Sequence, residues 1–222
     1  GVGSQALNAL TSGYANTAIG HEALKTNTSN YNTAVGYAAM RYHSGIRNLA
    51  FGVAALQGVV GNIGTGDDNI AIGYTSLNSN TTGSSNIGIG YEALYSNTTG
   101  DNNVAVGESA LMNATSSNNT AIGFHALRFN AGGTYNTAVG YESQKNLIVL
   151  SATTSQGHNT SLGYQALMGA SSGTRTGDQN TAIGSGPLQS ITTGTNNIGI
   201  GVCALKETTT GTKNVGVGNY SL

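Results

Sequence analysis

Histidines and acidic residues are the side chains of this sequence that could bind a metal or transfer a proton. The histidines show no metal-ligand spacing, and the aspartates lie in turn sequences without a calcium-loop pattern, although a calcium site at Asp67-Asp68 is an alternative. Only nine acidic residues are scattered over 222 positions, so the paired carboxylates of a polysaccharide-degrading enzyme are not expected. We therefore expect no metal, no cofactor and no catalytic residue. The residues considered are His21, His43, His125, His158, Asp67, Asp68, Asp101 and Asp178.

Motifs of other reactive groups are also missing. Serine, histidine and aspartate are all present, but no local motif places a serine as a nucleophile. Triplets such as Gly88-Ile89-Gly90 precede no helix, which argues against phosphate binding. Cys203 is the only cysteine, so an intrachain disulfide is impossible. The sequence does not predict an enzyme.

Charge and hydropathy exclude two further classes of partner. Charged residues make up 8% of the chain, against roughly 25% in a typical soluble domain. The net charge of −1 gives no electrostatic basis for binding nucleic acid or an acidic membrane surface. No apolar run approaches the roughly 20 residues that a membrane helix needs, so we expect no membrane insertion.

A repeat runs through the whole chain, and the fold must be interpreted from it. Its clearest copy is Asn86 to Leu94, with the sequence Asn-Ile-Gly-Ile-Gly-Tyr-Glu-Ala-Leu. We call the second glycine the anchor; consecutive anchors are 16 to 23 residues apart. Because the first and last residues both lie inside a repeat, we expect the chain to be a fragment of a longer fibre. The anchors are Gly3, Gly20, Gly36, Gly52, Gly73, Gly90, Gly107, Gly123, Gly140, Gly163, Gly184, Gly201 and Gly218.

Asparagine stands four residues before every anchor that has this position. Asparagine tolerates left-handed backbone, and stacked amides on successive coils can form a hydrogen-bonded ladder. We therefore predict a structural ladder; a row of polar ligand contacts is the alternative. The ladder residues are Asn16, Asn32, Asn48, Asn69, Asn86, Asn103, Asn119, Asn136, Asn159, Asn180, Asn197 and Asn214.

Two apolar columns accompany the asparagines. An aliphatic or aromatic residue precedes each anchor, with a very small residue before it, and this alternation is typical of a strand. Leucine usually stands four residues after the anchor, with Met40 and Gln144 as exceptions. A coil of 16 or 17 residues has room for about two short strands and two turns. So thin a coil encloses little apolar volume, which predicts that at least one apolar column faces another chain.

The motif Asn-Thr-Ala-Ile-Gly, with a following Ala-Leu and a Thr-Thr-Gly turn, resembles the head repeats of trimeric autotransporter adhesins and the repeats of phage tail-fibre and bacterial surface-fibre proteins. It stands at Asn16 to Leu24, Asn119 to Leu127 and Asn180 to Leu188. The resemblance implies an all-β, left-handed parallel β-roll or solenoid of about thirteen repeats, packed as a homotrimer. It also implies an extracellular location, in a cell-surface fibre or a virion tail.

Residues 1–222 are accordingly expected to form one repetitive domain with insertion loops at 57–68, 145–158 and 168–179. Insertions in solenoids often lie on a binding face. In the second loop, Leu147, Ile148 and Val149 follow Gln144, which interrupts the leucine column. These three residues are candidates for a receptor contact; alternatively, the loop folds over a neighbouring protomer and replaces the missing leucine.

Tyrosine often follows the anchor directly. Exposed tyrosines along a fibre are candidates for stacking on sugars, and the rim of an interface is the alternative role. We expect a homotrimeric adhesive or structural segment that contacts a cell-surface glycan or protein receptor. The alternative is a single-chain solenoid that binds ice or another repetitive surface. The tyrosines are Tyr37, Tyr74, Tyr91, Tyr141 and Tyr164.

Overall fold

The computed structural model describes residues 1–9, 12–146, 157–169 and 177–222. It contains two compact units, Gly1–Ser109 and Ala110–Leu222. Throughout the described ranges the regular elements are short strands, and no helix occurs. Both units repeat one coil, which consists of a three-residue strand, a turn at the anchor glycine, a buried return segment and a polar loop.

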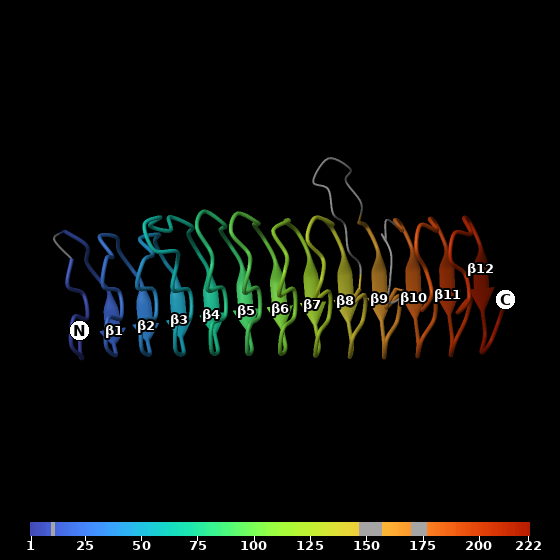
Figure 1. Ribbon diagram of the computed structural model, residues 1–222, viewed down its shortest axis with the longest axis horizontal. Helices are drawn as coiled ribbons and strands as arrows, with labels where there is room; N and C mark the ends of the chain where they lie inside the picture. Colours follow the sequence, from blue (N-terminus) through green and yellow to red (C-terminus); the bar gives the residue numbers. More distant parts are fainter. Residues whose placement is uncertain (10–11, 147–156, 170–176) are drawn as a thin grey trace. The chain divides into compact units, whose positions relative to one another are not determined.

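Strands in each unit pair in parallel and in chain order, side by side (Figure 1). Equivalent repeat positions face one another; for example, Ala18 of β1 pairs with Ala34 of β2. Each unit is therefore a parallel β-solenoid, and the all-β fold expected from the repeat is confirmed. Unit 1 contains β1 (Thr17–Ile19), β2 (Thr33–Val35), β3 (Leu49–Phe51), β4 (Ile70–Ile72), β5 (Ile87–Ile89) and β6 (Val104–Val106). Unit 2 contains β7 (Thr120–Ile122), β8 (Thr137–Val139), β9 (Thr160–Leu162), β10 (Thr181–Ile183), β11 (Ile198–Ile200) and β12 (Val215–Val217).

The core of each coil lies between the small middle residue of the strand and the leucine that follows the anchor. Ala71, in the middle of β4, and Leu77, on the return segment, are both completely buried. Since alternate side chains of a strand point to opposite faces, the residues on either side of Ala71 point outward. The core is therefore made of one small and one large residue per coil.

The return segment is not the second strand that the repeat length suggested. Ala54 and Leu56 have φ values of 54° and 48°, and equivalent residues of the other coils are similar. Two left-handed residues separated by one position curl the backbone, so this segment cannot extend as a strand. The curl directs the leucine into the coil and leaves one strand per coil in the described ranges.

The anchor glycines are required by both conformation and space. Gly184 has a φ of 131°, which side-chain-bearing residues rarely adopt. A Cβ atom on Gly184 would stand 2.5 Å from the carbonyl oxygen of Gly201 on the next coil. The stacking of the coils therefore depends on a glycine at this position.

In one pair of positions, deviations from the repeat compensate one another in the core. Gly88 replaces alanine in β5 where Ser76 replaces alanine before the leucine, and the Ser76 hydroxyl donates a hydrogen bond to the Gly88 carbonyl at 2.8 Å. Pro187 replaces alanine before the leucine of the next-to-last complete coil, and a Cβ on Gly199 of β11 would make only an ordinary van der Waals contact with it at 3.4 Å, so this pair is not a steric compensation.

The first insertion, within 57–68, forms a protruding turn. The Asn62 N–H donates to the Val59 carbonyl at 3.0 Å, and Gly61 has a φ of 80°. Val60 and Ile63 on this turn are exposed. Large parts of the loops at 145–158 and 168–179 lie outside the described residues, and these parts include Leu147, Ile148 and Val149.

Candidate functional site

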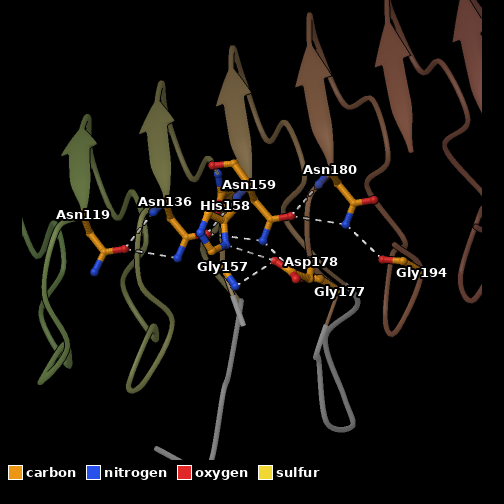
Figure 2. Close-up of polar contacts among 10 residues, drawn as sticks. Asn119, Asn136, Gly157, His158, Asn159, Gly177, Asp178, Asn180 and Gly194 are labelled. Carbon is orange, nitrogen blue, oxygen red and sulfur yellow. Dashed lines mark hydrogen bonds and ion pairs between the residues drawn. The ribbon is translucent and has the colours of Figure 1, made fainter. Parts of the chain in front are cut away.

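The repeat asparagines form a hydrogen-bonded ladder in each unit, and Figure 2 shows part of the ladder of unit 2. The Asn180 backbone N–H and side-chain amide both donate to Oδ1 of Asn159, at 2.9 and 3.2 Å. The Asn180 amide also donates to the Gly194 carbonyl at 2.9 Å. Oδ1 of Asn180 accepts in turn from Asn197. The amide thereby joins its own loop to the coil before it and to the coil after it.

Burial of the ladder leaves it little access to ligands. Within unit 1, the backbone N–H of each ladder residue from Asn32 to Asn103 bonds Oδ1 of the preceding one. The same bond recurs in unit 2 from Asn136 to Asn214. Most of these side chains are buried, so their hydrogen-bonding groups serve the coil itself.

The outer face of the strands carries a column of large, partly exposed apolar side chains. The residue before the anchor is 45% exposed at Ile19, 55% at Phe51 and 50% at Leu162. The leucine column, in contrast, is buried from Leu24 to Leu205. Of the two apolar columns identified in the sequence, only the one on the strands is therefore accessible to another chain. Its members are Val2, Ile19, Val35, Phe51, Ile72, Ile89, Val106, Ile122, Val139, Leu162, Ile183, Ile200 and Val217.

A second outward column, three residues before the anchor, differs along the chain. In unit 2, Thr120, Thr137, Thr160 and Thr181 are consecutive partners in register. Strands β3 to β6 carry Leu49, Ile70, Ile87 and Val104 at the same position. The outer face is therefore apolar on both columns in β3 to β6, and half hydroxylated in β7 to β10.

Aromatic side chains after the anchors stack on one another along the coils. In unit 2, ring centroids are 5.2 Å apart for Phe124–Tyr141 and 5.4 Å apart for Tyr141–Tyr164, with interplanar angles of 11° and 7°. Unit 1 has the stacked pairs His21–Tyr37 and Tyr74–Tyr91. The five candidate tyrosines remain about half exposed, but stacking covers much of their ring faces; they are Tyr37, Tyr74, Tyr91, Tyr141 and Tyr164.

Two glutamates next to the aromatic column form ion pairs with lysine side chains. Glu142 accepts from the Lys145 ammonium at 2.5 Å and from the Gln165 amide at 2.9 Å. Burial would raise the pKa of Glu142, but these hydrogen bonds lower it below the usual value. Glu22 in unit 1 pairs similarly with Lys25 at 2.6 Å, and this bond lowers its pKa. Both carboxylates are therefore ionised and hydrogen-bonded to neighbouring side chains, so neither holds a proton that a general acid could donate.

Gln144 belongs to a buried polar cluster that was not predicted from the sequence. Its amide nitrogen donates to the Ser161 hydroxyl at 2.8 Å and to the Thr137 carbonyl at 2.9 Å. The Ser161 and Ser143 hydroxyls lie 2.5 Å apart. Gln144 thus fills the place of the missing leucine itself. The signal was present in the sequence, because Ser161 is the serine of a column that is otherwise alanine or glycine.

His43 is a second buried polar group. Its Nε2 lies 2.8 Å from the Gly66 carbonyl, whereas Nδ1 has no hydrogen-bond partner in the described structure. Burial lowers the pKa of His43; the bond to Gly66 and the charge of Asp67 act against this shift. In other coils the equivalent position carries buried Asn27, Asn80 and Asn97.

The remaining histidines and aspartates do not converge. His125 lies 3.9 Å from Glu142, and His158 lies 3.7 Å from Asp178. The described ranges contain no group of three His, Cys, Asp or Glu residues arranged to hold a metal ion. Three aspartates instead accept hydrogen bonds from backbone N–H groups of the preceding coil: Asp67 from Ile46, Asp101 from Ser84, and Asp178 from Gly157. Asp68 accepts two hydrogen bonds from Arg47, at 2.6 and 2.7 Å.

Comparison with protein-family models, with curated proteins and with solved structures gave no match to this chain. A search of the described residues for a helix long and apolar enough to span a membrane also found none. Inference about function therefore rests on the surfaces of the two solenoid units.

Proposed function

We propose that this chain is a structural and adhesive segment of a homotrimeric, extracellular fibre, on a cell surface or a virion tail. In this role it presents repeated contacts to a glycan or protein receptor of a host cell. The observation that carries the proposal is the exposed apolar outer face of the strands.

Exposure of this face costs free energy that association would recover. Apolar surface contributes roughly 25 cal/mol for each Å² removed from water. Each of β4, β5 and β6 places two outward, half-buried aliphatic side chains on this face: Ile70 and Ile72, Ile87 and Ile89, and Val104 and Val106. A flat column of this kind can close around an axis shared with two further copies, as the sequence resemblance implies. The aromatic and polar edges of each coil then remain available to a receptor, three at a time.

The test is the solution mass of the chain by light scattering after size exclusion. A trimer gives about 67 kDa, which is three times 22.4 kDa. The double variant Ile72→Lys, Ile89→Lys places two charges on the outer face without entering the coil, and we expect it to reduce the mass to that of a monomer. Thr99→Lys, at an exposed position of a polar loop, is the matched control and should leave the mass unchanged. A wild-type mass of 22.4 kDa would contradict the proposal.

A second candidate function is the binding of ice or of another regular surface by a single chain. It is favoured by the register of Thr120, Thr137, Thr160 and Thr181, because this order presents hydroxyl groups at the regular spacing of neighbouring strands. A thermal-hysteresis measurement tests it directly. Hysteresis that Thr137→Lys abolishes would favour this function over the fibre.

A further inference from the structure

The protruding turn of the first insertion is attached to the coil through a short base. Where the chain enters the turn, the Gly58 N–H donates to the Asn78 carbonyl at 2.9 Å. Where it leaves, the Gly64 N–H donates to the Tyr42 carbonyl at 2.8 Å, and the Gly64 carbonyl accepts from the Ser44 N–H at 2.6 Å. The path of the turn therefore depends on how Gly64 is held against the preceding coil.

The His43 imidazole lies against this base. His43 and Gly64 form a parallel bridge, and a Cβ atom on Gly64 would overlap Nδ1 of His43. Nε2 of His43 lies 2.8 Å from the Gly66 carbonyl, which also accepts from the ladder amide of Asn48 at 3.0 Å. The ring is completely buried, so the segment 64–66 packs directly on it.

Asparagine holds the corresponding loop in regular coils. Asn97, seven residues after its anchor, accepts from the Gly100 N–H and donates to the Gly100 carbonyl, both at 3.0 Å. In the coil that contains the insertion, the residue seven positions after the anchor is Val59, which is exposed on the turn. His43 of the preceding coil supplies the contact to this loop instead, so a side chain that titrates replaces one that does not.

Protonation of His43 creates a buried donor without an acceptor. A carbonyl oxygen only accepts, so Nε2 carries the proton of the neutral ring and Nδ1 is unprotonated. Nδ1 has no hydrogen-bond partner in the described part of the chain. A second proton would therefore form an N–H beside the backbone of Gly64, on a ring that is charged and shielded from water, and this costs free energy.

Asp67 is the charged side chain that acts on His43, and it favours the imidazolium. Its Oδ1 already accepts from the Ile46 N–H at 2.8 Å. Arg47 and Asp68, which are neighbours of these residues in the sequence, form an ion pair with each other at the surface. Burial outweighs the favourable interactions, so the pKa of His43 in the closed loop lies below its ordinary value.

Opening of the turn alone would remove the cost of a buried imidazolium. Val60 and Ile63 are 76% and 50% exposed, so the turn loses little buried apolar area when it leaves the coil. Segments with few buried apolar contacts open at a lower free energy than the whole domain. The in-register pairing of β3 with β4 lies outside the turn and need not break.

We propose that His43 holds the turn 58–66 closed at neutral pH and releases it in acid. When the imidazole is protonated, the segment 64–66 leaves the ring and the turn opens, whereas β3 and β4 remain paired. The turn carries exposed apolar side chains, so its release changes the surface that this loop of unit 1 presents. The proposal concerns unit 1 by itself, and it applies to a monomer as well as to a trimer.

Hydrogen–deuterium exchange of the full chain at pH 7.5 and 5.5, measured by mass spectrometry and corrected for the intrinsic pH dependence of amide exchange, tests this proposal. The peptide 58–66 reports on the turn, and the peptide 84–92 reports on the ladder and on β5 of the same unit. We expect the protection of 58–66 to fall by up to about tenfold at the lower pH, because the open loop binds a proton that the closed loop does not. The protection of 84–92 should stay constant.

His43→Asn and His43→Gln remove the titrating group and keep an amide donor, so the protection of 58–66 should be the same at both pH values in each of them. His21→Asn, at an exposed histidine of the same unit, is the matched control and should respond as wild type does. Equal losses of protection in 58–66 and 84–92 would show that the whole unit opens. A wild-type response that persists in both His43 variants, or a wild type without any response, would equally overturn the proposal.

Discussion

Oδ1 of Asn180 accepts two hydrogen bonds from Asn197, one from the backbone N–H and one from the side-chain amide, both at 3.0 Å. The Asn180 amide nitrogen meanwhile donates to Asn159 and to Gly194. The asparagine amide accepts from one coil and donates to another, which aspartate cannot do because it has no amide donor and leucine cannot do because it has no polar group.

Asn180→Asp should therefore destabilise the solenoid strongly. The carboxylate would face Oδ1 of Asn159 and the Gly194 carbonyl without a proton to donate, in a buried position. A buried acceptor left unsatisfied costs about 1–3 kcal/mol, so we expect a loss of about 3 kcal/mol for the two contacts. Urea unfolding measures it. Asn196→Asp, at the exposed neighbouring residue, is the control; equal midpoints for the two variants would contradict a structural ladder.

Gly184→Ala tests the close contact between anchor turns. Its φ of 131° excludes alanine, and the added Cβ would press on the carbonyl of Gly201. Backbone strain and overpacking each cost about 1–3 kcal/mol, so a loss of about 4 kcal/mol in unfolding free energy is expected. Gly186→Ala, in the same turn but with a φ of 68° and only ordinary van der Waals contacts for the added Cβ, should cost no more than about 1 kcal/mol. Similar losses in both variants would show that space between the coils is not limiting.

Positions where a residue type recurs in every coil were the most predictable from sequence. Asparagine before the anchor, the small middle residue and the buried leucine recur because each contacts its own equivalent on the next coil. A repeat position that keeps the same residue type therefore indicates a contact that is formed in every coil. The parallel all-β fold follows from this property alone.

Features that depend on the path of the backbone could not be predicted. The spacing of the repeat does not show which of the two apolar columns is buried. The left-handed conformation of Ala54 and Leu56 turns the leucine side chains into the coil. Side-chain contacts between different columns were also missed. Gln144 and Ser161 each depart from their own repeat column, but these columns lie apart in the sequence, and only the path of the backbone shows that the two side chains meet across adjacent coils.

Restoring the repeat at the polar cluster should stabilise unit 2. Oε1 of Gln144 is buried without a hydrogen-bond partner in the described structure, whereas nearly every other coil has leucine or methionine there. The double variant Gln144→Leu, Ser161→Ala replaces both polar partners by the residues of a regular coil, and we expect a gain of about 1–2 kcal/mol. Ser161→Ala alone should instead cost about 1 kcal/mol, since the Gln144 amide loses an acceptor. Calorimetric unfolding of the four members of this cycle gives the coupling, and strictly additive effects would refute the contact.

Acid should weaken the coil that contains His43. Burial holds the folded-state pKa of His43 below its ordinary value of 6.5, although the Gly66 carbonyl and the charge of Asp67 oppose the shift. Above about pH 6.5 the imidazole is neutral in both states and has no effect on the pH dependence. As the pH falls below this value, the unfolded chain binds a proton that the folded chain does not, so the free energy of unfolding decreases until the folded pKa is reached.

His43→Asn isolates this contribution, because Asn27 and Asn97 show that asparagine fits the equivalent position and does not titrate. We expect the stability of wild type relative to this variant to be constant from pH 8 to 7. Below pH 6.5 it should decline, with a slope that approaches about 1.4 kcal/mol per pH unit. Urea unfolding at half-unit steps of pH measures the difference, and histidines common to both proteins cancel. Parallel curves down to pH 5 would mean that His43 is protonated as readily in the folded coil as in the unfolded chain.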